Sequence, residues 1–181
     1  MTNAEKFEEI YTANITRPGA DEFLKWLKST DFFTAPASTR FHGAYEGGLL
    51  EHSLNVYYEL LPLVADAETA AICGLLHDVC KADIYVHSFR NVKNEETGKW
   101  ERVPCYVKKD KFPYGHGEKS VYLIMKHMKL TDEEAMAIRW HMGAYDDAAR
   151  TNLGLISDAQ AWNPLVYELH AADMRASLKE K

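Results

Sequence analysis

The chain contains no apolar run that approaches the roughly 20 residues needed to cross a lipid bilayer. Its first residues, MTNAEKFEEI, lack the basic segment followed by an apolar segment that is typical of a secretory signal peptide. These absences argue against membrane insertion and export. The sequence therefore predicts a cytoplasmic protein with no membrane partner.

Cysteine is scarce: Cys73, Cys80 and Cys105 are the three in a chain of 181 residues. An odd number without a CxxC spacing predicts neither a disulfide framework nor a zinc ribbon, so we expect free thiols in a reducing compartment. Basic residues are also in deficit, with 21 Lys and Arg against 27 Asp and Glu and a formal net charge of -6. This balance argues against a protein that coats long nucleic acid, but it allows a small or short anionic ligand.

The chain is 46% hydrophobic, which is enough for one globular domain over residues 1–181 with a sizeable core. Apolar residues at one-face spacing predict helices through most of it, including covering helices within residues 1–40. Between residues 84 and 111 the pattern changes to the alternation of β-strands around a turn-like NEETG segment. The predicted fold is mostly α, with one inserted β-hairpin at 84–111 and later helices at about 117–128, 131–141 and 164–179.

Imidazole and carboxylate groups fall on the apolar faces or at the ends of these helices. Apolar residues lie three residues before and four after His52, which places it on the apolar stripe of a helix. The Ala- and Leu-rich segment 67–80 predicts a second buried helix, which carries His77 and Asp78 near its end.

Asp173 follows Leu169 by four residues and Leu165 by eight, so its carboxylate lies on the apolar face of the last helix. No Lys or Arg stands three or four residues from it. A buried, unpaired carboxylate is costly and must be protonated, salt-bridged or bound to a metal. His141 repeats the apolar-face pattern on its own helix, and His116 begins another.

Helices that present imidazole and carboxylate groups inward are how helical bundles assemble metal sites. Neutral imidazole with carboxylate suits Mn, Fe, Co, Ni or Zn better than Ca or Mg. The sequence therefore predicts one or two divalent transition-metal ions as cofactor.

The ordered set His52, His77-Asp78 within LLHDVCK, His116, His141 and Asp173 within HAADMRAS resembles the H…HD…H…H…D signature of HD-domain metal-dependent phosphohydrolases, over roughly residues 40–178. The stretch FHGAYEGGLLEHSLNV is similar to the start of the HD domain in a bacterial 3′-to-5′ exoribonuclease family, and HDVCK matches that family's HDxxK. This resemblance implies an HD-domain helical bundle that hydrolyses a phosphoester of a nucleotide or short oligonucleotide.

The resemblance also implies roles for single residues. Asp78 would bridge two ions, and Asp78 and Lys81 would be the catalytic residues. The ligands of the first ion would be His52, His77, Asp78 and Asp173, and those of the second ion would be Asp78, His116 and His141. Lys81, three residues after Asp78, is expected to bind a phosphate oxygen or to assist the leaving group. The alternative for Lys81 is a solvated lysine that complements a helix dipole.

Two departures limit the resemblance. The chain reads His141-Met142 where some two-metal members have paired histidines, so the second ion is expected to be weaker or absent. The oligonucleotide-binding domain that precedes the HD domain in the exoribonuclease family has no counterpart in this sequence, so only phosphoester chemistry is carried over. Mononucleotides, cyclic dinucleotides, short oligonucleotides and non-nucleotide phosphoesters all stay open as substrates.

Other functional classes also stay open. Some members of the wider superfamily use a similar ligand set as di-iron oxygenases, and a non-catalytic nucleotide-sensing module would keep the same pocket. Intact residues at all six ligand positions argue against the sensing module.

The hairpin region offers the main indication of substrate. Between residues 84 and 111 there are seven basic and four acidic residues, a local net charge of +3 in a chain of -6. This favours an anionic ligand, although lysines also protect edge strands from aggregation. Arg90 is a predicted substrate-binding residue of this region. Outside the hairpin, the resemblance implies that His42 also contacts a phosphate of the substrate, and the alternative is a loop histidine exposed to water. Trp100 and Tyr106 are suited to stacking on a base, but aromatic residues in strands more often serve packing.

Overall fold

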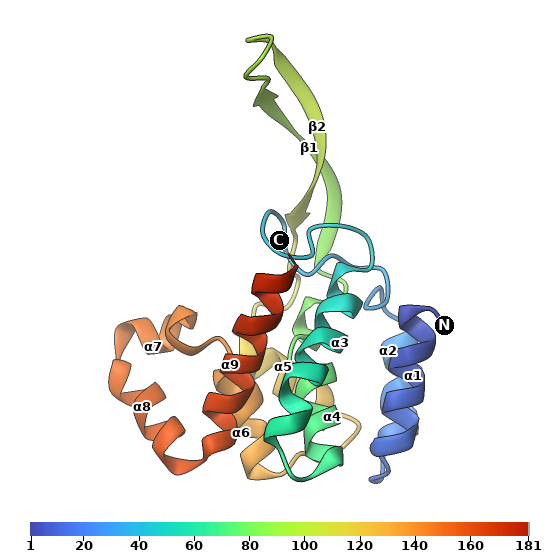
Figure 1. The fold of residues 1–181 in the computed structure, drawn as a ribbon, viewed down its shortest axis with the longest axis vertical. Helices are drawn as coiled ribbons and strands as arrows, with labels where there is room; N and C mark the ends of the chain where they lie inside the picture. Colours follow the sequence, from blue (N-terminus) through green and yellow to red (C-terminus); the bar gives the residue numbers. More distant parts are fainter. Residues whose placement is uncertain (181) are drawn as a thin grey trace.

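The computed structural model describes residues 1–180 and is mostly helical with one two-stranded sheet, as the sequence predicts (Figure 1). Within this range, no helix is both long and apolar enough to span a bilayer. In chain order the elements are α1 (Asn3–Asn14), α2 (Ala20–Lys28), α3 (Gly48–Leu60), the 3₁₀ turn η1 (Leu61–Leu63), α4 (Ala67–Leu76), η2 (Val79–Lys81), β1 (Tyr85–Lys93), β2 (Trp100–Lys108), α5 (His116–Met125), α6 (Asp132–Trp140), η3 (Gly143–Tyr145), α7 (Asp147–Thr151), α8 (Leu153–Trp162) and α9 (Pro164–Lys179).

Helix α3 holds the bundle together by packing against both α4 and α9. Helix α9 in turn packs against α6, and α6 against α5. Their apolar faces meet in one core, where Leu49, Leu60, Leu75 and Ile124 have no exposed surface. Each such side chain contributes about 1.5 to 3 kcal/mol by leaving water, so these five helices are held in fixed relation to one another.

Helices α3 and α4 approach closely because a glycine lies at their contact. A Cβ atom built on Gly74 would lie 2.5 Å from the Cα atom of Tyr57, much closer than packed atoms tolerate. The absence of a side chain at Gly74 therefore lets the end of α4, which leads into His77, lie beside α3.

The predicted covering helices are present as α1 and α2. Phe7 and Phe23, one from each helix, have no exposed surface and join the same core as the bundle. Arg17, in the loop between them, forms ion pairs with Glu68 at 3.2 Å and with the fully buried Glu134 at 2.6 Å. The N-terminal helices are thus tied to α4 and α6 by charge as well as by apolar contact.

Helix α5 was expected to reach residue 128 and ends at Met125. The chain turns there, which lets Met128 and Leu130 enter the core. Helices α7 and α8 have no counterpart among the predicted helices. They begin at side-chain caps made by Asp146 and Asn152 and pack with α6 and α9 around a smaller apolar cluster.

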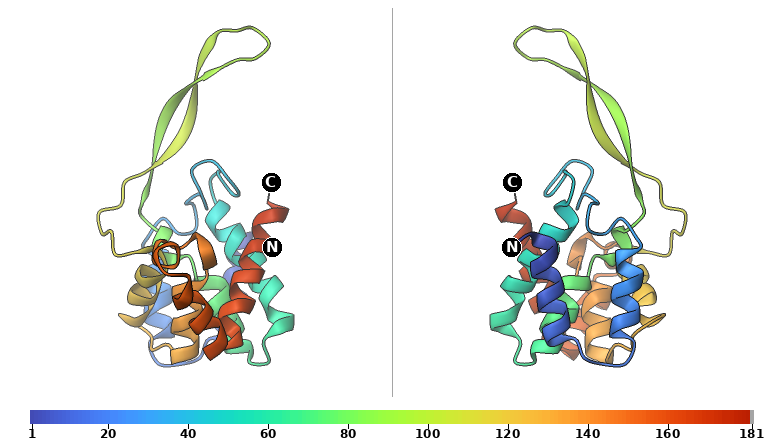
Figure 2. Two further views of the ribbon diagram at one scale, coloured as in Figure 1. Left: turned by 90° about the vertical axis from the view of Figure 1, so that its left-hand side faces the viewer. Right: turned by 90° about the vertical axis from the view of Figure 1, so that its right-hand side faces the viewer.

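The predicted hairpin is present as β1 and β2, paired antiparallel from Tyr85 opposite Lys108 to Lys93 opposite Trp100. It projects away from the helices (Figures 1 and 2). Figure 1 shows that it leaves the bundle at the same end as the C-terminal end of α9 and the loop that precedes α3.

Candidate metal centre

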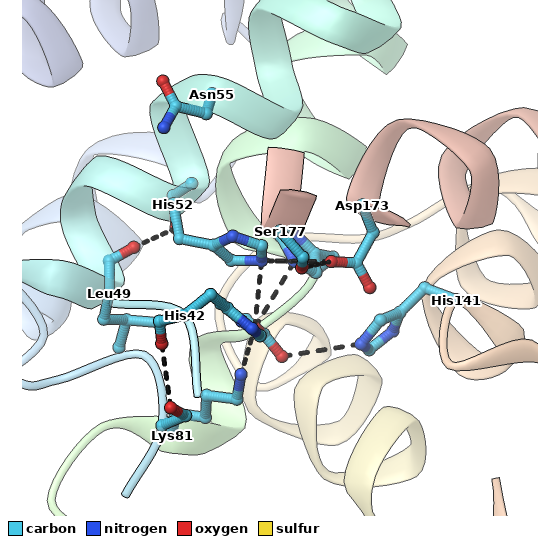
Figure 3. A network of polar contacts seen from close by, with 12 residues as sticks. His42, Leu49, His52, Asn55, Lys81, His141, Asp173 and Ser177 are labelled. Carbon is cyan, nitrogen blue, oxygen red and sulfur yellow. Dashed lines mark hydrogen bonds and ion pairs between the residues drawn. The ribbon is translucent and has the colours of Figure 1, made fainter. Parts of the chain in front are cut away.

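The structure brings together the six predicted metal ligands at this end of the bundle. Figure 3 shows His52, His141 and Asp173 from this set, with Lys81 and His42 beside them. His52, His77 and His141 are fully buried, and Asp78 and Asp173 are nearly so. The side chain of His116 is 27% exposed. Potential ligand atoms from these residues and from Cys80, His42 and Glu180 form groups of three whose members lie within 4.8 Å of one another.

His52 on α3 and His77 at the end of α4 face each other. Their Nε2 atoms are 3.3 Å apart. The Nδ1 atom of His77 donates to the carbonyl of Gly74 at 3.0 Å, which leaves the Nε2 lone pair directed into the cluster. Burial lowers the pKa of His77, so this imidazole is neutral near pH 7 and able to act as a ligand.

Asp78 lies at the centre of the cluster. The α4 helix ends at Leu76, earlier than the predicted 67–80 segment, because the chain tightens into the η2 turn. The Oδ2 atom of Asp78 lies 3.6 Å from His52 Nε2 and 3.5 Å from His77 Nε2. Its Oδ1 atom lies 2.9 Å from His116 Nε2 and 3.5 Å from His141 Nε2.

The carboxylate of Asp78 is therefore shared between two pairs of imidazoles, one pair on each oxygen. Burial alone would raise the pKa of Asp78, but the positive charge of Lys81 and the hydrogen bond from His116 hold it well below its usual value. Asp78 is thus ionised and acts as the negative centre of the group.

His141, at the C-cap of α6, has an unusual hydrogen-bonding state. Its Nδ1 atom donates to the carbonyl of Ile138 at 2.6 Å. Its Nε2 atom is buried and has no hydrogen-bond partner among the described residues. An unsatisfied buried polar atom costs about 1 to 3 kcal/mol. The Nε2 atom of His42 is also buried without a hydrogen-bond partner among the described residues, so two nitrogens of this region lack a bonding partner.

His116 is placed by the start of α5. The preceding Gly115 has a φ of 90°, a conformation that favours glycine, and it turns the chain into the helix. The Sγ atom of Cys80 lies 3.4 Å from His116 Nδ1. Burial raises the pKa of Cys80 to about 12, so its sulfur contacts the ring as a thiol and not as a thiolate.

Asp173 on α9 completes the group from the side of the last helix. Its Oδ1 atom lies 3.1 Å from His52 Nε2, and the Ser177 hydroxyl donates to it at 3.4 Å. Burial by itself would raise the pKa of Asp173, but the hydrogen bond with His52 outweighs burial and holds the pKa below its usual value. This carboxylate is therefore ionised.

The far side of the His52 ring is supported by Glu180, which follows the end of α9. The Glu180 carboxylate lies 3.1 Å from His52 Nδ1 and accepts from Asn55 Nδ2 at 2.8 Å. Burial would lower the pKa of His52, but its bonds to Asp173 and Glu180 outweigh burial and raise it to about 9. Glu180 is absent from the predicted ligand set, although it stands seven residues after Asp173 and so shares its helix face.

His170 on α9 supports the backbone of His141. Its Nδ1 atom donates to the His141 carbonyl at 2.6 Å. A Cβ atom on Gly143, where φ is 55°, would lie 2.5 Å from the His170 ring, so a glycine is required at this turn.

The residues predicted to bind substrate lie at different distances from the cluster. The Lys81 Nζ atom is 2.6 Å from Asp78 Oδ2, with the lysine side chain 12% exposed. The His42 ring centroid is 4.7 Å from that of His52. Arg90 lies on the projecting strand β1, is exposed, and forms no ion pair with any residue in 1–180.

Two pockets border the cluster. One, of about 410 Å³, is lined by Arg40, Phe41, His42, Met174, Ser177 and Leu178. The other, of about 120 Å³, includes His116 with Met142 and Tyr145. The group of imidazoles and carboxylates is therefore buried but approachable from the side of His42 and from the side of His116.

No protein-family profile, no curated protein and no solved structure matches this chain. The arrangement of the side chains must therefore carry the functional argument. It provides several imidazoles, two ionised carboxylates and the partly exposed ammonium of Lys81 in a single group.

Proposed function

We propose that this protein is a metal-dependent phosphohydrolase of the HD type. The observation that carries the proposal is the position of Asp78: one ionised carboxylate, nearly fully buried, offers each of its oxygens to a different pair of imidazoles. Buried charges of this kind persist in proteins when they are paired or coordinate metals.

The residues fit a transition-metal ion. The Nε2 atom of His141 is buried without a hydrogen-bond partner in residues 1–180, which is the state expected of a ligand nitrogen. His77 and His141 each use Nδ1 on a backbone carbonyl, the outer contact that commonly fixes the tautomer of a metal-bound histidine. Imidazole and carboxylate donors favour Mn, Fe, Co, Ni or Zn.

The contacts of Asp78 support two ligand sets that share its carboxylate. One set would be His52, His77, Asp78 and Asp173, and the other Asp78, His116 and His141. Potential ligand atoms of His141, His77 and Asp173 also lie within 4.8 Å of one another, so His141 could contribute to either set. When bound, divalent ions supply Lewis acidity: they neutralise charge that develops on a phosphoryl group and make water a better nucleophile near pH 7.

Lys81 adds a fixed positive charge beside this group. Burial would lower its pKa, but Asp78 holds the pKa above the usual lysine value, so the ammonium stays charged. Because its side chain is partly exposed, Lys81 is able to hold an oxygen of a phosphate that approaches Asp78. Burial lowers the pKa of His42, so His42 meets the substrate as a neutral imidazole that donates or accepts one hydrogen bond.

The test is metal analysis of the purified protein, followed by assays of a phosphomonoester and a phosphodiester with Mn, Co, Ni, Zn and Fe. We expect one or two bound ions per chain and metal-dependent release of the alcohol or phosphate. Two bound irons with a mixed-valence spectrum and oxygen consumption, without hydrolysis, would contradict the proposal and favour a di-iron oxygenase. Ion binding without either activity would favour a sensing module.

A further inference from the structure

The two faces of the projecting hairpin differ sharply in chemistry. Successive residues of a strand point to opposite faces, so the pairing register assigns every side chain to one face. The first face, which we call the aromatic face, consists of Tyr85, His87, Phe89, Asn91, Lys93, Trp100, Arg102, Pro104, Tyr106 and Lys108. The opposite face, the valine face, consists of Val86, Ser88, Arg90, Val92, Glu101, Val103, Cys105 and Val107.

Aromatic and positive groups are segregated onto the aromatic face. It holds every aromatic residue of the two strands and three of their four basic residues, with no acidic residue. On the valine face, Arg90 and Glu101 cancel in charge. The local positive charge of the hairpin strands is therefore presented on one side only, in a protein whose overall charge is -6.

Contacts within the aromatic face bring its aromatic and positive groups together. The rings of His87 and Tyr106 lie 4.7 Å apart between centroids. The guanidinium of Arg102 lies 4.3 Å from the centre of the Phe89 ring. Phe89 is nevertheless 56% exposed and Trp100 is 70% exposed. Large aromatic rings left in water beside cations are suited to a ligand that offers both flat apolar groups and negative charge.

The aromatic face begins beside the candidate metal centre. Tyr85 is its first residue and follows Lys81 by four positions. Lys81 itself lies 2.6 Å from the Asp78 carboxylate, so the face starts four residues along the chain from a direct contact with the cluster. Nine residues in each strand span about 30 Å, long enough for several nucleotides to lie along the face.

We propose that the aromatic face of the hairpin binds a single-stranded oligonucleotide, with bases stacked on its rings and phosphates held by Lys93, Arg102 and Lys108. Bases stack on exposed aromatic side chains regardless of sequence, and interleaved basic residues follow the backbone. A duplex hides its base faces, so the surface selects single strands. A single-stranded oligonucleotide would then be the substrate class of the proposed phosphohydrolase. Binding to this face does not need the metal chemistry; only cleavage of the bound strand at the cluster rests on the proposed function.

The test is a binding measurement by fluorescence anisotropy with fluorescein-labelled oligonucleotides of about ten nucleotides. Three probes are compared: a single-stranded RNA, a single-stranded DNA and a duplex of equal length. EDTA is present, so binding is measured without metal-dependent cleavage. We expect single strands to bind at least tenfold more tightly than the duplex, and the two single-stranded arms to show which sugar the face prefers.

Variants of the two faces make the test specific. Phe89→Ala should weaken binding by about five- to a hundredfold, the range for loss of one stacked base. Arg102→Ala should weaken it and reduce the salt dependence by about one phosphate contact. Arg90→Ala is the matched control. The sequence predicted that Arg90 binds substrate, but the pairing register puts it on the valine face, next to the Asn91–Arg102 pair. Under this inference its loss removes the same charge as Arg102→Ala but should change binding less than about twofold.

Several results would overturn the inference. Equal losses from Arg90→Ala and Arg102→Ala, equal affinity for single strand and duplex, or no binding at low salt would each do so. Concentration-dependent dimerisation in sedimentation, abolished by Phe89→Ala, would assign the face to a second copy of the chain instead. Hydrolysis of a small phosphodiester without oligonucleotide binding refutes this surface alone, whereas face-specific binding without hydrolysis refutes the proposed metal chemistry alone.

Discussion

Glu180 contacts His52 on the side of the ring that faces away from the cluster, so its replacement tests whether that ring is held in place to bind an ion. The Glu180 side chain is 2% exposed, and its two oxygens lie 3.1 and 3.2 Å from His52 Nδ1. Glu180→Gln keeps the size of the side chain and its carbonyl acceptor but removes the charge. Glu180→Ala removes the contact altogether.

The expected magnitude follows from this geometry. A charge-assisted hydrogen bond is roughly twice as strong as a neutral one, so the Gln variant retains part of the orienting effect. Loss of such an outer partner of a ligand histidine commonly weakens metal binding by about ten- to a hundredfold, which is about 1.4 to 2.8 kcal/mol. We expect Gln near the lower limit and Ala near the upper limit. Only the ion held by His52 should be affected.

The assay is titration of the metal-free variants with Mn or Zn against a chelating dye, with thermal unfolding to confirm that each variant is folded. Glu168→Gln is the matched control, because it makes the same change on α9 away from the cluster. Equal losses in the Glu168 and Glu180 variants, or wild-type affinity in Glu180→Ala, would refute the role assigned to this carboxylate.

Three further outcomes are expected. Lys81→Ala should keep the bound ions but lower kcat/KM by about ten- to a thousandfold, and unchanged kinetics would leave Lys81 as a structural partner of Asp78. Arg17→Met should lower the free energy of unfolding, measured in urea, by about 3 kcal/mol because it leaves the charge of the buried Glu134 without its partner. Lys28→Met, which breaks an exposed ion pair, should lower it by less than about 1 kcal/mol. Equal losses in the two variants would contradict the role given to burial. Removing the ions with a chelator should lower the melting temperature, since ligand present at about a thousandfold over Kd stabilises a native state by about 4 kcal/mol, and an unchanged melting temperature would contradict a site formed only in the folded chain.

Periodicity predicted the burial of candidate ligands on helices, because spacing along a helix determines which residues share its apolar face. His52 and Asp173 were placed on apolar faces by residues three, four or eight positions away, and the structure buries both. Glu180 was missed because it follows the last residue of α9. At the end of a helix, the exposure of a side chain depends on what packs against the last turn and not on the spacing of apolar residues. Cys80 was missed because its contact with His116 joins segments 36 residues apart.

Helices α7 and α8 could not be predicted from periodicity. Each begins at a polar side chain, Asp146 or Asn152, that bonds to backbone amides just after it, and α7 is only five residues long. Such short helices depend on caps and on tertiary contacts more than on an amphipathic pattern. The composition of the two hairpin faces likewise depends on the pairing register of the strands. A shift of one strand by one residue would move its side chains to the other face. The observed register places Arg90 and Arg102 on opposite faces.

The most direct test of the central claim is metal analysis combined with phosphoester hydrolysis for Asp78→Ala, with the exposed Asp158→Ala as the matched control. Because both oxygens of Asp78 face imidazole pairs, its loss should strip the ions from both ligand sets and abolish hydrolysis, whereas His52→Ala should deplete mainly one set and His116→Ala the other. Asp158→Ala should retain the ions and the activity. Full metal content and unchanged turnover in folded Asp78→Ala would contradict a metal centre built around this carboxylate.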